Sequence, residues 1–99
     1  MKSAPRYLVG IDLGTTHTVV AYADLKAAGT ARIQLFPIEQ LIAPGAVAAR
    51  PLLPSVRYHP TEGELAAADV RLPWDFIDPG AVPDVVLGEL ARERGSRTP

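Results

Sequence analysis

Two segments rich in apolar and β-branched residues, separated by a short polar stretch, open the chain. Tyr7–Ile11 contains strand-forming residues and one glycine, and His17–Tyr22 is a second β-branched and aromatic run. The polar stretch between them, Asp12–Thr16, holds a glycine where the backbone must reverse direction. Because so few residues separate the two runs, antiparallel pairing is the simplest closure. The pattern predicts a β-hairpin.

Two later segments also have the alternation of a strand. Ala31–Phe36 alternates polar and apolar residues with a period of two, which predicts a third strand that continues an antiparallel meander. Ser55–His59 alternates in the same way and is followed by a Pro-Thr-Glu-Gly turn signal. We therefore predict that Ser55–His59 pairs with Glu64–Val70 in a second hairpin.

Prolines interrupt the remaining pattern. Each proline removes a backbone donor and restricts the residue before it, so we predict that residues 37–54 are mostly loop, with Ile38–Ile42 as a helical turn. Residues 72–83 contain three more prolines and are predicted to be irregular. The prolines of the first of these segments are Pro37, Pro44, Pro51 and Pro54.

A helix is predicted at the C-terminal end. Asp84–Arg94 has apolar residues at helical spacing, with Asp84 as N-cap and Gly95 as the stop. The fold class is therefore α+β, with an antiparallel meander and hairpins followed by a C-terminal helix. With 99 residues the chain has room for one domain, spanning residues 1–99.

Composition narrows the classes of partner. The formal net charge is −1, so no broad positive field favours nucleic acid or an anionic membrane as a partner. The chain has no cysteine, which excludes disulfides and cysteine-based chemistry and fits a reducing compartment. No apolar run is long enough for a transmembrane helix or a signal peptide. We expect a cytoplasmic protein.

Candidate chemistry is concentrated at the tip of the first hairpin. Gly14 followed by Thr15 and Thr16 would present successive N–H groups and two hydroxyls, a concave arrangement that binds anions such as phosphate. The carboxylate of Asp12 would repel a bare phosphate but would suit a divalent cation between carboxylate and phosphate oxygens. This combination suggests a Mg-nucleotide. An ordinary hairpin, in which Asp12 caps the turn and the threonines favour β structure, explains the same residues.

The exact string at this tip resembles a known family. Val9–Thr16 followed by Val19–Ala21 resembles the first phosphate-binding hairpin of the DnaK-type heat-shock chaperones (heat shock protein 70 family), which belong to the actin-like ATPase superfamily. Leu53–Val56 resembles their threonine-proline-serine strand start, and Val86–Arg92 resembles a helix with valine, glycine, alanine and a basic residue. Taken in order, the resemblance spans most of the chain.

The chain also departs from the pattern of that family. His17 stands where the chaperones usually have asparagine, and Leu53 stands in place of threonine. Residues 37–51 and 65–83 are longer than in the typical family sequence. These departures indicate a divergent bacterial DnaK-like member.

The resemblance implies a site. By resemblance, Asp12 would hold Mg²⁺ through water, and Gly14, Thr15 and Thr16 would contact the β- and γ-phosphates of ATP or ADP. Gly10 would allow a close approach at the hairpin. The implied fold is part of a ribonuclease-H-like lobe, the N-terminal part (lobe I) of a nucleotide-binding domain.

The resemblance also implies a function for a longer parent protein. We expect this chain to be an incomplete segment of a chaperone ATPase, inactive alone, with unfolded peptide or protein clients bound through domains that the chain lacks. A carbohydrate kinase of the same superfamily is an alternative. A non-catalytic interaction module on the same fold is another.

The predicted strands carry apolar residues on both faces, which suits a sheet covered on both sides. The C-terminal helix and the proline-rich segments are the only cover that the 99 residues offer. We therefore expect the chain to form a homo-oligomer, by strand addition or face-to-face packing of the sheet, with an apolar interface that involves the sheet more than the face that carries Arg92–Arg97. On that face, arginines interleave with glutamates, which predicts a solvated, ion-paired surface.

Overall fold

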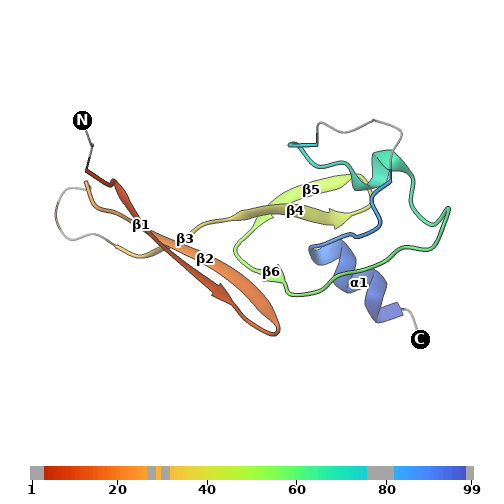
Figure 1. Ribbon diagram of the computed structural model, residues 1–99, viewed down its shortest axis with the longest axis horizontal. Coiled ribbons are helices and arrows are strands. Elements are labelled where there is room, and N and C mark those ends of the chain that lie inside the picture. The colour runs from red at the N-terminus through yellow and green to blue at the C-terminus, as the bar shows by residue number, and fades with distance from the viewer. Residues whose placement is uncertain (1–3, 27–28, 30–31, 76–81, 98–99) are drawn as a thin grey trace.

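The computed structural model describes residues 4–26, 29, 32–75 and 82–97. In this part of the chain it has six strands, one 3-10 helix and one α-helix, arranged as in Figure 1. The elements are β1 (Tyr7–Leu13), β2 (His17–Asp24), β3 (Gln34–Leu35), β4 (Ile38–Ala43), β5 (Ala46–Arg50), β6 (Leu53–Pro54), η1 (Ala67–Val70) and α1 (Glu89–Arg97). The α+β class predicted from the sequence is confirmed.

The first sheet is built on the predicted hairpin. Strands β1 and β2 pair antiparallel along the whole length of β1. Of the predicted third strand, residue 31 lies outside the described part, and within residues 32–36 the strand comprises Gln34–Leu35, which pairs with β2. Strand β6 pairs with the start of β2, where Leu53 lies opposite Thr18. The segment that follows β5 is thereby brought to the tip of the hairpin.

The prediction that residues 37–54 are mostly loop is wrong, and so is a helical turn at Ile38–Ile42. Strands β4 and β5 form a second antiparallel hairpin with an irregularity between Leu41 and Ala43. Its turn is Pro44–Gly45, and the φ of 72° at Gly45 matches the second central residue of a type II turn, in which proline commonly precedes it. Pro44 lies in the turn and not in the β4–β5 ladder, so it favours the hairpin instead of interrupting a strand.

The predicted pairing of Ser55–His59 with Glu64–Val70 is also wrong. The backbone of Tyr58 pairs with Val86, through two hydrogen bonds of 3.0 and 2.8 Å. Between residues 60 and 70, carboxylates turn back onto nearby backbone N–H groups, which favours local turns over a strand. Residues 72–75 and 82–83 are irregular as predicted, and residues 76–81 lie outside the described part.

The C-terminal helix exists but its predicted bounds are wrong. It begins at Glu89 instead of Asp84, and it continues through Gly95 to Arg97. Gly88 has a φ of 97°, which no helical residue adopts, so the segment before it cannot join the helix. A Cβ at residue 88 would also lie 2.9 Å from the Leu41 carbonyl oxygen. A glycine is needed at this position on both counts.

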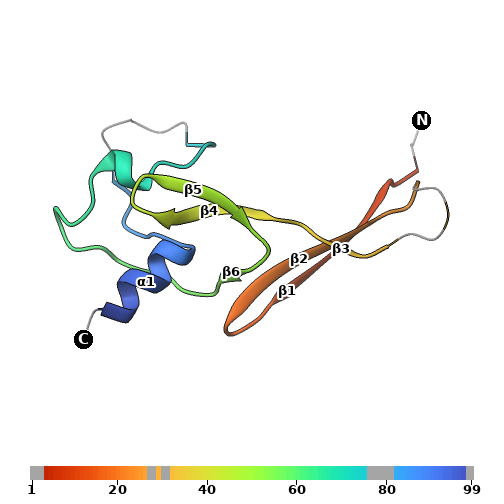
Figure 2. The ribbon, with the colours of Figure 1, turned by 180° about the vertical axis from the view of Figure 1, so that it is seen from behind.

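The hydrophobic core lies in the half of the molecule that contains β4, β5, η1 and α1. Its buried members are Leu41, Leu65, Val70, Val86, Leu90 and Ala91. The β1–β2 hairpin extends away from this core, as Figures 1 and 2 show from opposite sides. The radius of gyration is 16.9 Å, against about 13 Å for a compact domain of about 100 residues. The hairpin therefore has no hydrophobic layer of its own beneath it in the described part of the chain.

One buried amide connects the elements around the core. Gln40, whose exposed fraction is 3%, lies in β4 next to Leu41. Its Nε2 donates hydrogen bonds to the Leu52 carbonyl at 3.0 Å and to the Ile38 carbonyl at 3.3 Å. Its Oε1 accepts the Glu89 N–H at 3.0 Å. Since the first N–H groups of a helix have no partner inside the helix, this amide satisfies one of them and ties α1 to β4.

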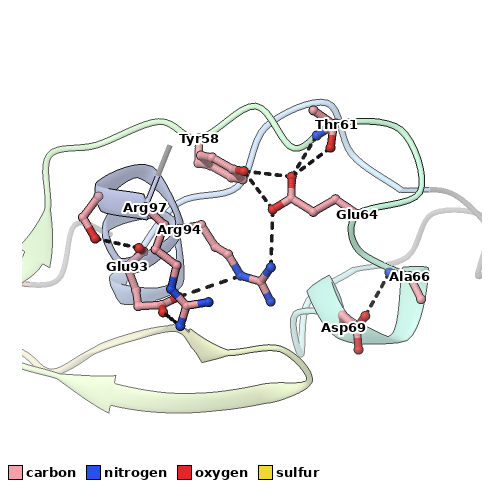
Figure 3. Close-up of polar contacts among 9 residues, drawn as sticks. Tyr58, Thr61, Glu64, Ala66, Asp69, Glu93, Arg94 and Arg97 are labelled. Atoms are coloured by element: carbon pink, nitrogen blue, oxygen red, sulfur yellow. Dashed lines mark hydrogen bonds and ion pairs between the residues drawn. The ribbon is translucent and has the colours of Figure 1, made fainter. Parts of the chain in front are cut away.

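A second polar cluster joins the 58–64 segment to α1 (Figure 3). The Glu64 carboxylate accepts hydrogen bonds from the Tyr58 hydroxyl at 2.8 Å and from the Thr61 N–H at 2.9 Å. Arg94 of α1 forms an ion pair with it at 3.4 Å. The Thr61 N–H and the Tyr58 hydroxyl lower the pKa of the Glu64 side chain, and Arg94 adds to this effect.

We predict that Gln40→Leu lowers the free energy of unfolding by about 1–3 kcal/mol, because the Glu89 N–H and the Leu52 carbonyl lose their partner in a buried position. Urea denaturation measures this change. The matched variant Glu39→Ala alters the exposed neighbour in the same strand and should stay within about 0.5 kcal/mol of the unmodified chain. Equal stability of both variants would contradict the role assigned to the amide.

The lowered pKa of Glu64 predicts a pH dependence. A carboxyl whose pKa is lower in the folded state contributes stability above its unfolded pKa, and this stability is lost as the pH falls through the folded pKa. Glu64→Gln should therefore lower stability at neutral pH and flatten the fall in stability in the acid range. Glu62→Gln, a nearby exposed change, should follow the unmodified chain when midpoints of urea denaturation are compared across this range.

Candidate functional site

The tip of the β1–β2 hairpin is a tight turn with Thr15 and Thr16 at its centre. The Gly14 N–H donates a hydrogen bond of 3.0 Å to the His17 carbonyl, which closes the turn. A Cβ at residue 14 would lie 2.5 Å from that carbonyl oxygen, closer than any side chain tolerates. Glycine is therefore required at residue 14 by the close approach of the backbone.

Ser55, just after β6, holds the tip in place. Its Oγ donates to the Gly14 carbonyl at 2.7 Å, and its N–H donates to the Thr16 carbonyl at 3.0 Å. The hydroxyls of Ser55 and Thr18 are 3.2 Å apart and share a further hydrogen bond. The tip is thus anchored through the carbonyl groups of Gly14 and Thr16.

Thr15 and Thr16 are exposed, and within the described residues no hydrogen bond uses their N–H groups or hydroxyls. Asp12 is also exposed and lies in β1 on the same face as Gly10, two positions away. A Cβ at Gly10 would meet open space. The structure therefore brings all five sequence-predicted site residues into one strand and its turn. The N–H groups of Thr15 and Thr16 have no partner in the described residues, whereas the Gly14 N–H that was expected to face a ligand is used within the turn.

A cation at this tip would depend on oxygen atoms that the chain does not supply. Among the described residues no three His, Asp or Glu side chains come together as a metal site. Asp12 alone fits Mg²⁺ that keeps several waters and bridges to phosphate oxygens, since Mg²⁺ is commonly bound by one or two carboxylates plus a substrate phosphate. The Asp12 carboxylate is thus compatible with a hydrated Mg²⁺ that also contacts a phosphate.

A cleft of about 230 Å³ separates the start of β2 from α1. His17 and Arg92 face each other across it, with 3.4 Å between the His17 Nε2 and the Arg92 Nη1. Arg50 and Glu89, also on its wall, form an ion pair at 3.1 Å. Within the described part of the chain no carboxylate pairs with Arg92, whereas Arg94 and Arg97 both pair with glutamates of their surroundings. Arg92 is the cation of α1 that lies beside the tip.

Sequence reasoning did not assign Ser55 to the site, and for Arg92 it favoured an ion-paired surface over a phosphate contact. Both lie in stretches quoted for the resemblance, Leu53–Val56 and Val86–Arg92, and that was the available signal. Arg92 is exposed as predicted, but among the described residues it forms no ion pair. The fold places its side chain against His17 instead.

A larger cavity of about 450 Å³ lies elsewhere, among β4, η1 and residues 85–87. Its walls are mainly apolar and include members of the core such as Leu41, Val70 and Val86. None of the predicted site residues lines it. The cavity is an extension of the core, and the candidate chemistry lies at the hairpin tip.

Comparisons with known proteins do not identify the chain: no known protein family, no curated protein and no solved structure matches it. In the described part of the chain, no helix has the length and apolar character that crossing a membrane requires.

We predict that Ser55→Ala loosens the tip. Loss of one neutral hydrogen bond is worth about 0.5–1.5 kcal/mol, so amide hydrogen exchange at Gly14 should accelerate about two- to twelve-fold. Exchange at Leu8, near the other end of β1, should not change. Ser96→Ala, which removes a hydroxyl contact to the Glu93 carbonyl on α1, is the matched serine control. Unchanged exchange at Gly14 would show that the serine does not hold the tip.

Proposed function

We propose that the β1–β2 tip binds the phosphates of Mg-ATP or Mg-ADP, and that the chain is the N-terminal segment of lobe I in a DnaK-like chaperone ATPase. The observation that carries the proposal is the tip itself. Thr15 and Thr16 present N–H groups and hydroxyls to solvent, while Ser55 and Gly14 fix the backbone behind them. Successive N–H groups of this kind bind phosphate oxygens.

Each predicted residue then has a distinct role. Gly14 permits the tight turn, and Thr15 and Thr16 donate to the β- and γ-phosphates. Asp12 accepts hydrogen bonds from the waters of Mg²⁺, which would neutralise phosphate charge. Gly10 leaves room beside Asp12 for these waters, since no atom lies within 4 Å of a Cβ built there.

Arg92 adds a positive charge next to the tip. Its guanidinium lies in the cleft with His17, and no described carboxylate neutralises it. A planar guanidinium with several donors suits phosphate oxygens. We assign Arg92 as a further phosphate contact. The His17 ring, whose Nε2 lies 3.4 Å from the Arg92 Nη1, would help to position the guanidinium.

The 99 residues alone would bind nucleotide weakly and would not turn it over. A few exposed hydrogen bonds contribute about 0.5–1.5 kcal/mol each, which is little against the loss of freedom of a bound nucleotide. Hydrolysis and the binding of unfolded peptide or protein clients belong, in this proposal, to a longer protein that contains the segment. The absence of cysteine from the chain supports a cytoplasmic location for it.

Titration of the ¹⁵N-labelled chain with Mg-ATP, followed by NMR, tests the proposal. We expect the Thr15 and Thr16 amide signals to shift with a dissociation constant in the millimolar range or weaker. Asp12→Asn should weaken binding of Mg-ATP more than binding of ATP without Mg²⁺, because only the former uses the carboxylate. Glu62→Gln removes one exposed negative charge far from the tip in sequence and is the matched control.

Two results would contradict this function. One is the absence of any shift at Thr15 and Thr16 at high millimolar Mg-ATP. The other is an equal effect of Asp12→Asn with and without Mg²⁺, which would reduce Asp12 to a source of general negative charge.

A further inference from the structure

Strand β1 forms an open edge of the first sheet. It pairs with β2 on one side only, and all seven of its residues are exposed. Figure 2 shows the hairpin extending away from the rest of the molecule. Proteins normally protect such an edge, because unpaired N–H and C=O groups next to apolar side chains bind another strand. The exposed apolar side chains of β1 are Tyr7 (49%), Leu8 (66%), Val9 (57%), Ile11 (63%) and Leu13 (80%).

The hydrogen bonds at the two ends of the hairpin show which backbone groups are free. The Arg6 carbonyl accepts the Leu25 N–H at 2.6 Å, and the Gly14 N–H donates to the His17 carbonyl at 3.0 Å. In an antiparallel ladder the residues of one strand alternate between facing the partner and facing away. The even-numbered residues of β1 therefore bond to β2, and the odd-numbered residues direct their N–H and C=O groups to the open edge.

We propose that a second copy of this chain pairs with β1, antiparallel, about a two-fold axis at Gly10. In this register Val9 lies opposite the partner's Ile11, and Tyr7 lies opposite the partner's Leu13. Each of these residues has its free N–H and C=O on the open edge. Every outward group of β1 then finds a partner, and the two strands join into one continuous ladder.

The side chains agree with the same register. The odd-numbered residues of β1 are all apolar, so an apolar row extends unbroken across the axis. Asp12 lies opposite the partner's Leu8, and no two like charges are opposite. Arg6 is one diagonal position from the partner's Asp12, although its guanidinium already pairs with Asp24 of its own chain at 3.3 Å. The register of β1 with itself, an apolar row with no like charges opposite, is the reason to assign the edge to a second copy.

Gly10 is consistent with its place on the axis. Glycine weakens a strand interior, and here neither a positive φ nor a steric contact within the described part of the chain requires it. In the dimer it faces the partner's Gly10 as a non-hydrogen-bonded pair, the type in which backbones approach most closely, at about 4.5 Å between Cα atoms. This distance lies within the range that a disulfide bridges.

A single-cysteine experiment tests the register directly, because the chain has no cysteine of its own. Gly10→Cys places one thiol on the axis in open space, and air oxidation should convert most of the chain to a disulfide-linked dimer. Leu8→Cys is the matched control on the same exposed strand. Its thiols would lie about 14 Å apart along the strand and should cross-link at least ten-fold more slowly.

Sedimentation velocity from low to high micromolar concentration tests the association itself. The unmodified chain should shift from monomer to dimer. Ile11→Pro removes an outward N–H without removing a bond to β2, and it should raise the dissociation constant at least ten-fold. Val9→Lys places two like charges diagonally across the axis and should also raise the dissociation constant at least ten-fold. It tests the same edge without introducing a proline into the hairpin. Ile33→Lys changes an apolar residue that is as exposed as Leu13 (80% each) but lies outside β1. This variant should leave association unchanged.

The proposal is overturned by any of three results. The first is a monomer at every concentration. The second is an equal rate of cross-linking for the Leu8→Cys and Gly10→Cys variants. The third is a dimer that Ile33→Lys disrupts but Val9→Lys does not.

Discussion

The buried amide of Gln40 is the contact on which the folded half of the molecule depends. Two of its three hydrogen bonds link β4 to the segment before β6 and to the first N–H of α1, and the third is to Ile38 within β4. Gly88 lets the chain turn tightly enough for that N–H to reach it, because any Cβ there would collide with the Leu41 carbonyl. With α1 fixed, Leu90 and Ala91 complete the core, and Arg92, the next residue, contacts His17 beside the hairpin tip. The position of Arg92 beside the candidate site thus follows from a buried polar contact elsewhere.

The hairpin has the opposite character, since its order comes from hydrogen bonds and not from burial. Ser55 fixes the tip through two carbonyl groups, and β6 fixes the start of β2, so the segment that leaves the core also positions the site. Such a scaffold leaves donors at Thr15 and Thr16 exposed. A ligand that bears negative charge, or a sheet that covers the strands, would supply the contacts that the core does not provide.

How much was predictable depends on how local each interaction is. The β1–β2 hairpin and its turn could be predicted, since runs of strand-forming residues and a short polar stretch encode them within residues 7–24. Strands β4 and β5 could not be predicted from the rule that prolines interrupt strands, although Pro44–Gly45 is itself a turn signal. The contact of Gln40 with Glu89 spans 49 positions and that of Arg92 with His17 spans 75, and no periodicity in a single sequence encodes such pairs. The five proposed site residues were found because they lie in one short segment, whereas Ser55 and Arg92 reach it only through the fold.

One strand supports both the proposed phosphate tip and the proposed dimer edge, and the geometry keeps them compatible. The two-fold axis passes through Gly10, and Gly14 lies about four residues farther along the chain. Strands rise about 3.4 Å per residue, so the two tips of a dimer would lie about 27 Å apart and point in opposite directions. The phosphate-binding donors lie at the turn, beyond the ladder that joins the copies, so pairing does not occupy them. The two proposed functions meet at Gly10, which would lie on the axis and beside the waters of Mg²⁺, and at Asp12. The Asp12 carboxylate would have the partner's Arg6 diagonally across the strand pair and a hydrated Mg²⁺ beside it. Because both are cations that favour the same carboxylate, their electrostatic contributions there compete, and reciprocity requires that each weaken the other to the same extent.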